Sequence, residues 1–213
     1  MHDTKTNRPF AEVVRGFKFQ ASPSACYTVS IHNILEELAS RHERNDIRLS
    51  EKRINEITKF RDLIGPRLEV VVSNLRSVIS KYGYFPYEKF NAKYDNVLKV
   101  LKDQECSYPL VGLAYSYLRR ERGMFTNDVP PENPPDHVVI LLLLNKDDAV
   151  LYDPYGKFSR TRSNDGTLPE GVFRLPTSRF LDVYWHGASE PSWFFYIERK
   201  GGHREGLDTY INN

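Results

Sequence analysis

One cysteine of this sequence is placed where a thiol can act as a nucleophile. Cys26 precedes apolar residues that recur at helical intervals, which predicts an amphipathic helix over residues 25–42 with the cysteine at its start. A free thiol titrates at about 8.5, so a nucleophilic cysteine needs a helix N-terminus, an imidazolium or both to be a thiolate at neutral pH. The other cysteine, Cys106, lies in a polar turn without a nearby histidine, and we expect it to be incidental.

The general base must come from a distant part of the chain. His32 follows Cys26 by six residues, which on a helix turns it roughly 240° away, and His42 is too far along the helix axis. His137 lies between a proline-rich loop and the apolar run 138–144, where the start of a strand can present an imidazole at the edge of a sheet. We therefore expect His137 to be the base.

A carboxylate can reach this histidine if two strands pair. Residues 145–148 have the composition of a hairpin turn, and the strand that returns from it ends at Asp153. Antiparallel pairing then brings Asp153 beside His137, where it can hold the tautomer of the ring and stabilise its cation.

Gln20 completes the candidate site. It precedes Cys26 by six residues on a segment broken by Pro23, so its side-chain amide and the backbone N–H groups at the helix start can form an oxyanion hole. A cysteine, a histidine or an Asp-Pro turn is usually structural when taken alone. The joint occurrence of all four residues, each on an element suited to its role, favours a catalytic site.

The surrounding elements predict an α+β fold in one domain, residues 1–200, followed by a polar tail, residues 201–213. The front half is expected to be helical. Antiparallel strands follow, so the nucleophile helix should pack on a C-terminal β-sheet. The predicted strands are 108–118, 138–144, 149–153 and 193–198, and a short helix is predicted at 177–185.

Composition excludes several functional classes. The 30 Lys and Arg residues against 28 Asp and Glu residues give a net charge of +2 without a basic block, so we expect no nucleic-acid partner. No apolar run is long enough to span a membrane and no secretory signal is present, which predicts a cytoplasmic protein. Two isolated cysteines form neither a disulfide framework nor a typical zinc site, and we expect no cofactor.

Three motifs resemble a known family: QASPSAC at residues 20–26, DHVVILLLL at 136–144 and LYDPYG at 151–156 are similar to the papain-like leader peptidases of bacteriocin-exporting transporters, which process double-glycine leaders. The resemblance implies a papain-like fold and cysteine peptidase activity. It also implies that Gln20 is the oxyanion-hole donor, Cys26 the nucleophile, His137 the general base and acid, and Asp153 the orienting residue.

The sequence departs from that family in two places. Tyr27 replaces the glycine that usually follows the nucleophile, and a long loop, residues 119–136, precedes the histidine and is a candidate gate or specificity element.

We expect Cys26 to attack a peptide or isopeptide carbonyl and form a thioester, with a peptide or protein as substrate. Two alternatives stay open. One is an acyltransferase or transglutaminase-like enzyme with the same triad, and the other is an inactive papain-like module that binds a peptide while Tyr27 fills the cleft. Oligomeric state is left open.

Overall fold

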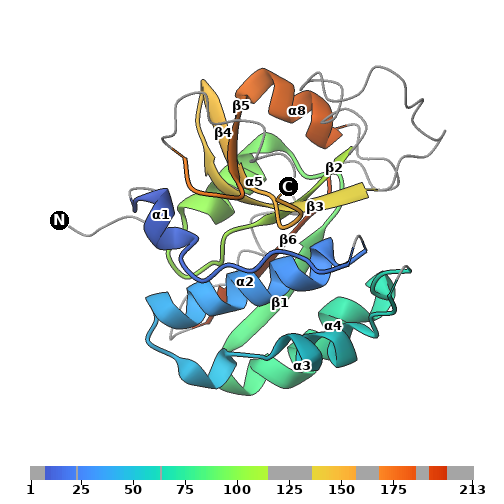
Figure 1. Cartoon of the computed structure of the whole chain (residues 1–213). Helices are drawn as coiled ribbons and strands as arrows, with labels where there is room; N and C mark the ends of the chain where they lie inside the picture. Colours follow the sequence, from blue (N-terminus) through green and yellow to red (C-terminus); the bar gives the residue numbers. More distant parts are fainter. Residues whose placement is uncertain are drawn as a thin grey trace.

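A six-stranded antiparallel sheet with the strand order β1-β6-β2-β3-β4-β5 organises the chain (Figure 1). The computed structural model describes residues 8–22, 24–62, 64–114, 136–156, 168–185 and 192–200. The strands are β1 (Tyr84–Lys89), β2 (Leu110–Ala114), β3 (Asp136–Leu144), β4 (Asp148–Tyr152), β5 (Val172–Pro176) and β6 (Phe194–Arg199). The expected α+β class is confirmed.

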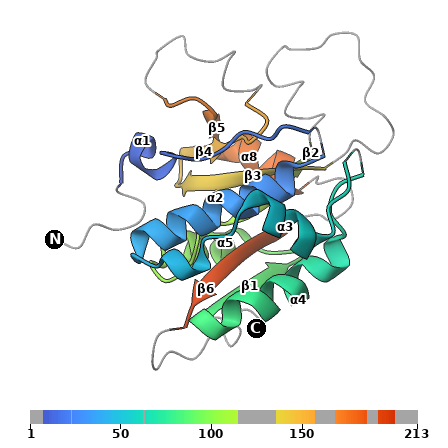
Figure 2. The same ribbon diagram turned by 60° about the horizontal axis from the view of Figure 1, so that its bottom comes forward.

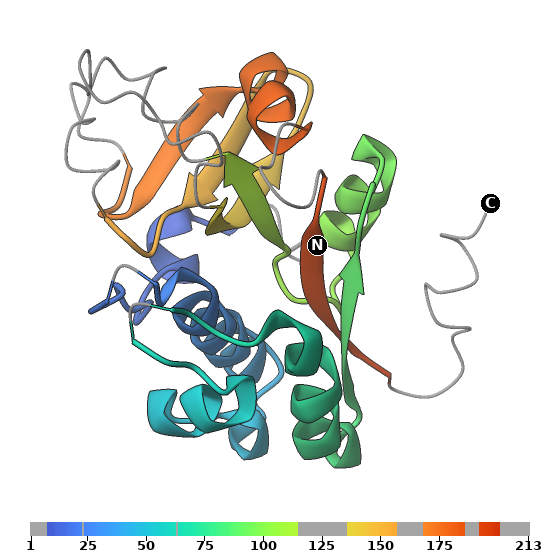
Figure 3. The same ribbon diagram turned by 90° about the vertical axis from the view of Figure 1, so that its right-hand side faces the viewer.

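Helices cover both faces of this sheet. They are α1 (Phe10–Val13), α2 (Cys26–Arg41), α3 (Glu51–Thr58), α4 (Leu68–Ile79), α5 (Tyr94–Lys102) and α8 (Thr177–Trp185), with 3-10 turns at Asn45–Ile47 and Ser80–Tyr82. Figure 3 shows α2, α3 and α4 grouped on one side of the sheet and α5 and α8 on the other. No helix in these described parts of the chain is long and apolar enough to cross a membrane.

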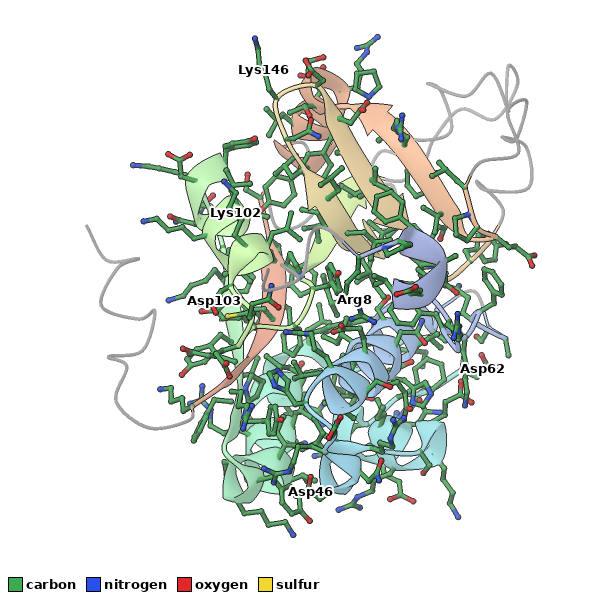
Figure 4. All side chains as sticks on the ribbon, turned by 90° about the vertical axis from the view of Figure 1, so that its left-hand side faces the viewer. Arg8, Asp46, Asp62, Lys102, Asp103 and Lys146 are labelled. Atoms are coloured by element: carbon green, nitrogen blue, oxygen red, sulfur yellow. The ribbon has the colours of Figure 1, made fainter. Side chains whose placement is uncertain are left out.

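The central helix α2 runs along β3 (Figure 2). It is buried on more sides than an amphipathic helix would be, because the sheet, α3 and the segment before α2 all pack against it. Two of its buried polar side chains, Asn33 and Glu37, are paired. The side chain of Asn33 accepts from Lys18 N at 2.8 Å and donates to Lys18 O at 3.0 Å, and the carboxylate of Glu37 pairs with Arg8, labelled in Figure 4, and with Arg41. These bonds fix the position of α2 against the chain on its N-terminal side.

The hairpin predicted between β3 and β4 is confirmed. Asn145 N donates to Asp148 O at 3.0 Å, and the side chain of Asn145 accepts from the backbone N–H groups of Asp147 and Asp148. Leu141 pairs with Leu151, and a register shift follows between Leu141 and Leu143. β3 and β4 are therefore joined in the way that the candidate site requires.

The expectation of an all-helical front half is wrong, because β1 lies within it. Gly83 has a φ of 82° and ends the preceding turn, so the chain reverses into an extended strand that pairs with β6. Pro86 lies within β1, which is possible because β1 is an edge strand with one partner. β5 was also not predicted. Positions 115–118 of the predicted strand, positions 119–135 of the candidate gate and the tail 201–213 lie outside the described residues.

His42, at the C-terminal end of α2, makes the stability of the fold depend on pH. Its Nδ1 accepts from Arg199 Nη1 at 2.8 Å. Burial and the charges of Arg41 and Arg199 lower its pKa from 6.5 to about 4. The unfolded chain therefore binds a proton between these pH values that the folded chain does not, and stability falls as the pH is lowered through this window.

We expect a His42→Gln variant to lose less stability than the wild type when the pH falls from 7 to 5. The difference should be about 1 kcal/mol, after discounting for solvent screening of the partly buried ring. Urea denaturation followed by circular dichroism at both pH values measures it. An identical pH dependence in the two proteins would contradict this role for His42.

Candidate active site

Cys26 is the first residue of α2, where helix geometry supplies free backbone N–H groups. No side chain caps this end of the helix, and the turn before it is closed by Ala25 N donating to Ser22 O at 3.1 Å. The thiol is partly buried and free of any disulfide. The positive end of the helix dipole therefore lies beside the sulfur.

His137 and Asp153 form a buried pair on neighbouring strands. His137 lies near the start of β3, opposite Leu113 of β2, and Asp153 directly follows β4. The distance from His137 Nε2 to Asp153 Oδ1 is 2.6 Å, and the two residues are 5% and 0% exposed. Asp153 Oδ1 also accepts from Tyr155 N at 2.8 Å. The carboxylate is thus held by its own turn while it orients the ring.

The thiol of Cys26 forms a hydrogen bond with the side chain of His137. Because Nε2 of the ring is bonded to Asp153, Nδ1 is the ring nitrogen left for the sulfur. The structure therefore brings together three of the four predicted site residues, although 111 positions separate the cysteine from the histidine.

The contact between Cys26 and His137 changes the pKa of both side chains. Burial by itself raises the pKa of the Cys26 thiol, but the hydrogen bond and charge of His137 outweigh it and bring the pKa below its usual value. Burial by itself lowers the pKa of His137, whereas Asp153 and then Cys26 raise it to about 10. Both shifts favour a thiolate beside an imidazolium, which is the reactive form of a catalytic cysteine.

Gln20 lies on the segment that leads into α2, and this segment is anchored to the loop after β4. Gln20 N donates to Pro154 O at 2.8 Å, next to Asp153. Phe17 and Phe19 pack on the ring of Tyr152, whose hydroxyl donates to Lys18 O at 3.1 Å. The side-chain amide Nε2 of Gln20 donates to Ser22 O at 2.9 Å. The backbone hydrogen bond from Gln20 to Pro154 thus attaches the segment before the nucleophile to the loop that carries Asp153.

Tyr27 does not fill a cleft, so that part of the inactive-module hypothesis is wrong. Its ring is 2% exposed and packs edge-on against Trp193 at 5.3 Å and Phe195 at 5.8 Å. The residue that follows the nucleophile therefore points into the core between α2 and β6, because the side chains of neighbouring helix positions point in different directions.

The remaining candidate residues lie apart from this site. His32 is buried and contacts Leu49 O through Nδ1 at 3.0 Å. Cys106 ends the turn after α5, where its N–H donates to Asp103 O at 3.3 Å, and its side chain is fully buried in the core. Within the described part of the chain, no group of three or more His, Cys, Asp or Glu residues could hold a metal ion.

Sequence analysis missed Tyr155, whose ring meets the ring of His137 edge-on at a centroid distance of 6.4 Å. The Asp-Pro-Tyr-Gly sequence at residues 153–156 could have indicated this contact. An aspartate at a strand end commonly accepts from the backbone N–H two residues later, and this bond places Tyr155 against the histidine.

The contact between Cys26 and His137 predicts how the reactivity of the thiol depends on pH. Because His137 lowers the pKa of Cys26, the wild type should react with iodoacetamide at a lower pH than a free thiol does. In a His137→Ala variant the midpoint of the rate profile should move upward. Mass spectrometry after timed labelling measures it, and a Cys106→Ala background removes the second thiol. Coincident profiles for wild type and His137→Ala would exclude the ion pair.

Comparison with known proteins gives matches at the level of structure. No protein-family model matches the sequence, and no curated protein sequence matches it. A double glycine motif protease from an AMS/PCAT transporter, solved in complex with the leader peptide, is 11% identical, with a TM-score of 0.48 over 85% of this chain and 89% of that one. A protein of Bacillus anthracis assigned as a C39-like peptidase is 12% identical, with a TM-score of 0.54 over 87% of this chain and 95% of that one. The chain therefore has the papain-like fold of the C39-like peptidases, as the resemblance of its motifs predicted.

Proposed function

We propose that this protein is a cysteine peptidase that cleaves a peptide or isopeptide bond through a thioester on Cys26. The proposal rests on one observation. The Cys26 thiol at the N-terminus of α2 is hydrogen-bonded to the His137 imidazole, which is hydrogen-bonded to the Asp153 carboxylate. The papain-like fold supports the same reaction class, although a fold alone does not establish an activity.

In the proposed reaction the Cys26 thiolate attacks the carbonyl carbon of the scissile bond, and the carbonyl oxygen becomes an oxyanion. Backbone N–H groups at the start of α2 and the Nε2 amide of Gln20 would stabilise this charge. His137 then donates its Nδ1 proton to the leaving nitrogen, the carbon–nitrogen bond breaks, and a thioester remains. His137 next removes a proton from water, which attacks the thioester and releases the acid and the thiolate.

Asp153 would act through the histidine. Its bond to Nε2 fixes the tautomer that places Nδ1 toward the sulfur, and its charge stabilises the imidazolium present in the resting state. Because Asp153 is fully buried, this charge is little screened by water.

We expect Cys26→Ala to abolish turnover and His137→Ala to lower kcat by at least about 10²-fold. Asp153→Asn keeps the shape of the carboxylate but removes its charge, and should lower kcat while retaining fold. Hydrolysis of a peptide library, followed by mass spectrometry, measures the activity, and circular dichroism checks each fold. Wild-type rates in Cys26→Ala or His137→Ala would refute the assignment.

The nucleophile that attacks the thioester decides whether the enzyme is a hydrolase or an acyltransferase, since both use the same triad. With water as the acceptor, we expect the free acid to be the main product even in the presence of a primary amine such as glycine methyl ester. Mass spectra of the products with and without the amine measure the ratio. An amide product that replaces the acid at low amine concentration would indicate a transferase instead.

A further inference from the structure

The backbone of Lys18 is held from two sides of the candidate site. On one side, the side chain of Asn33 on α2 accepts from Lys18 N at 2.8 Å and donates to Lys18 O at 3.0 Å. On the other side, the hydroxyl of Tyr152, the last residue of β4, donates to Lys18 O at 3.1 Å. Lys18 lies on the segment from α1 to α2, which runs between α2 and β4 (Figure 1). These three hydrogen bonds therefore link the helix that begins at Cys26 to the strand that leads to Asp153.

The helix α2 transmits this attachment to the nucleophile. Asn33 follows Cys26 by seven positions, and seven positions turn an α-helix to within roughly 20° of two complete turns. Cys26 and Asn33 therefore lie on the same face of α2. Asn33 is 0% exposed and both ends of its side-chain amide are bonded, so its place on the helix is fixed. A shift of Asn33 relative to β4 would thus move Cys26 in the same direction.

Packing on several sides fixes the ring of Tyr152. Phe17 meets this ring edge-on at a centroid distance of 5.1 Å, and Phe19 stacks on it at 5.7 Å. Gly171 lies against the same ring, because a Cβ atom at this position, where φ is 82°, would come within 2.5 Å of Tyr152 Cε2. The carbonyl oxygen of Gly171 also accepts from Asp153 N at 2.8 Å. The hydroxyl of Tyr152 is thus presented from a rigid support that also holds Asp153.

We propose that Tyr152 is a positioning residue, which acts through Lys18 and Asn33 to hold the nucleophile helix where the thiol of Cys26 reaches the ring of His137. The expected effect on turnover rests on the proposed peptidase function. The expected effect on the contact between thiol and imidazole can be measured without a substrate, so the two proposals can fail separately.

The hydroxyl of Tyr152 is not needed to satisfy a buried carbonyl group. Lys18 O also accepts from Asn33 Nδ2, so Tyr152→Phe removes one hydrogen bond and leaves this oxygen with a donor. The net contribution of one such bond to stability is small, and a phenylalanine ring keeps the packing on Phe17 and Phe19. A misplacement of catalytic groups by about 1 Å, however, can lower the rate about 10²-fold. We therefore expect Tyr152→Phe to lower kcat by about 10-fold with only a small fall in the thermal midpoint.

The experiment follows the rate of Cys26 alkylation by iodoacetamide against pH, in the full-length protein with Cys106→Ala. The midpoint of the rate profile should be higher in Tyr152→Phe than in the wild type, because the misaligned imidazolium of His137 stabilises the thiolate less. In a His137→Ala background, Tyr152→Phe should leave the midpoint unchanged, since the group that the hydroxyl helps to align is gone. Hydrolysis of the peptide library gives kcat for the same variants.

Tyr184→Phe is the matched control. The hydroxyl of Tyr184 on α8 also donates to a backbone carbonyl, Ser192 O at 2.8 Å, and Tyr184 is 3% exposed, against 1% for Tyr152. The two variants should therefore have similar thermal midpoints. Tyr184→Phe should nevertheless keep the wild-type kcat and the wild-type alkylation profile, because its hydrogen bond lies outside the segment that joins α2 to β4.

Two results would overturn the role of Tyr152 while leaving the peptidase proposal intact. One is an unchanged alkylation midpoint in Tyr152→Phe, and the other is an equal upward shift in Tyr184→Phe. A shift found only in Tyr152→Phe, in a protein that cleaves none of the peptides, would instead support the positioning role and overturn the proposed function.

Discussion

The hydrogen bond between His137 and Asp153 is the interaction on which the candidate site depends. Burial alone would leave the imidazole neutral and the thiol protonated, because desolvation disfavours both charged forms. The carboxylate reverses this preference for the histidine, and the imidazolium then reverses it for Cys26. A reactive thiolate in this place therefore requires a third group that never contacts the sulfur, held 2.6 Å from the ring.

The fold supplies that geometry through two independent attachments. The pairing of β3 with β4 carries Asp153 to the histidine, and the turn after β4 fixes the carboxylate through Tyr155 N. The segment before Cys26 is held at the same loop by Gln20 and Pro154, and at Lys18 by the buried side chain of Asn33. Since the nucleophile and the carboxylate are fixed against one another by these bonds, the histidine between them has little freedom to leave the site.

Local sequence patterns predicted the parts of the fold that depend on residues close together along the chain. Helical spacing located α2 with Cys26 at its start, and the turn composition at residues 145–148 located the hairpin that brings Asp153 to His137. The edge strand β1 was missed because its partner β6 is more than 100 positions away, and Pro86 disfavours a central strand. The sequence also did not predict how deeply Cys106 and Glu37 are buried, or that the Tyr27 ring points into the core. The reason is related. Burial depends on which elements pack together, and the periodicity of a single segment does not contain that information.

The energetic cost of this site argues for function more strongly than the likeness of the fold does. At 12% identity, the shared fold carries no information on activity by itself. A buried thiolate, imidazolium and carboxylate, however, are weak contributors to stability, because apolar residues of similar volume commonly stabilise a core as well or better. A histidine whose pKa is raised to about 10, in contact with a cysteine at a helix N-terminus whose pKa is lowered, is typical of an active site. The arrangement of Cys26, His137 and Asp153 is thus better explained by the chemistry it permits than by any contribution to the stability of the core.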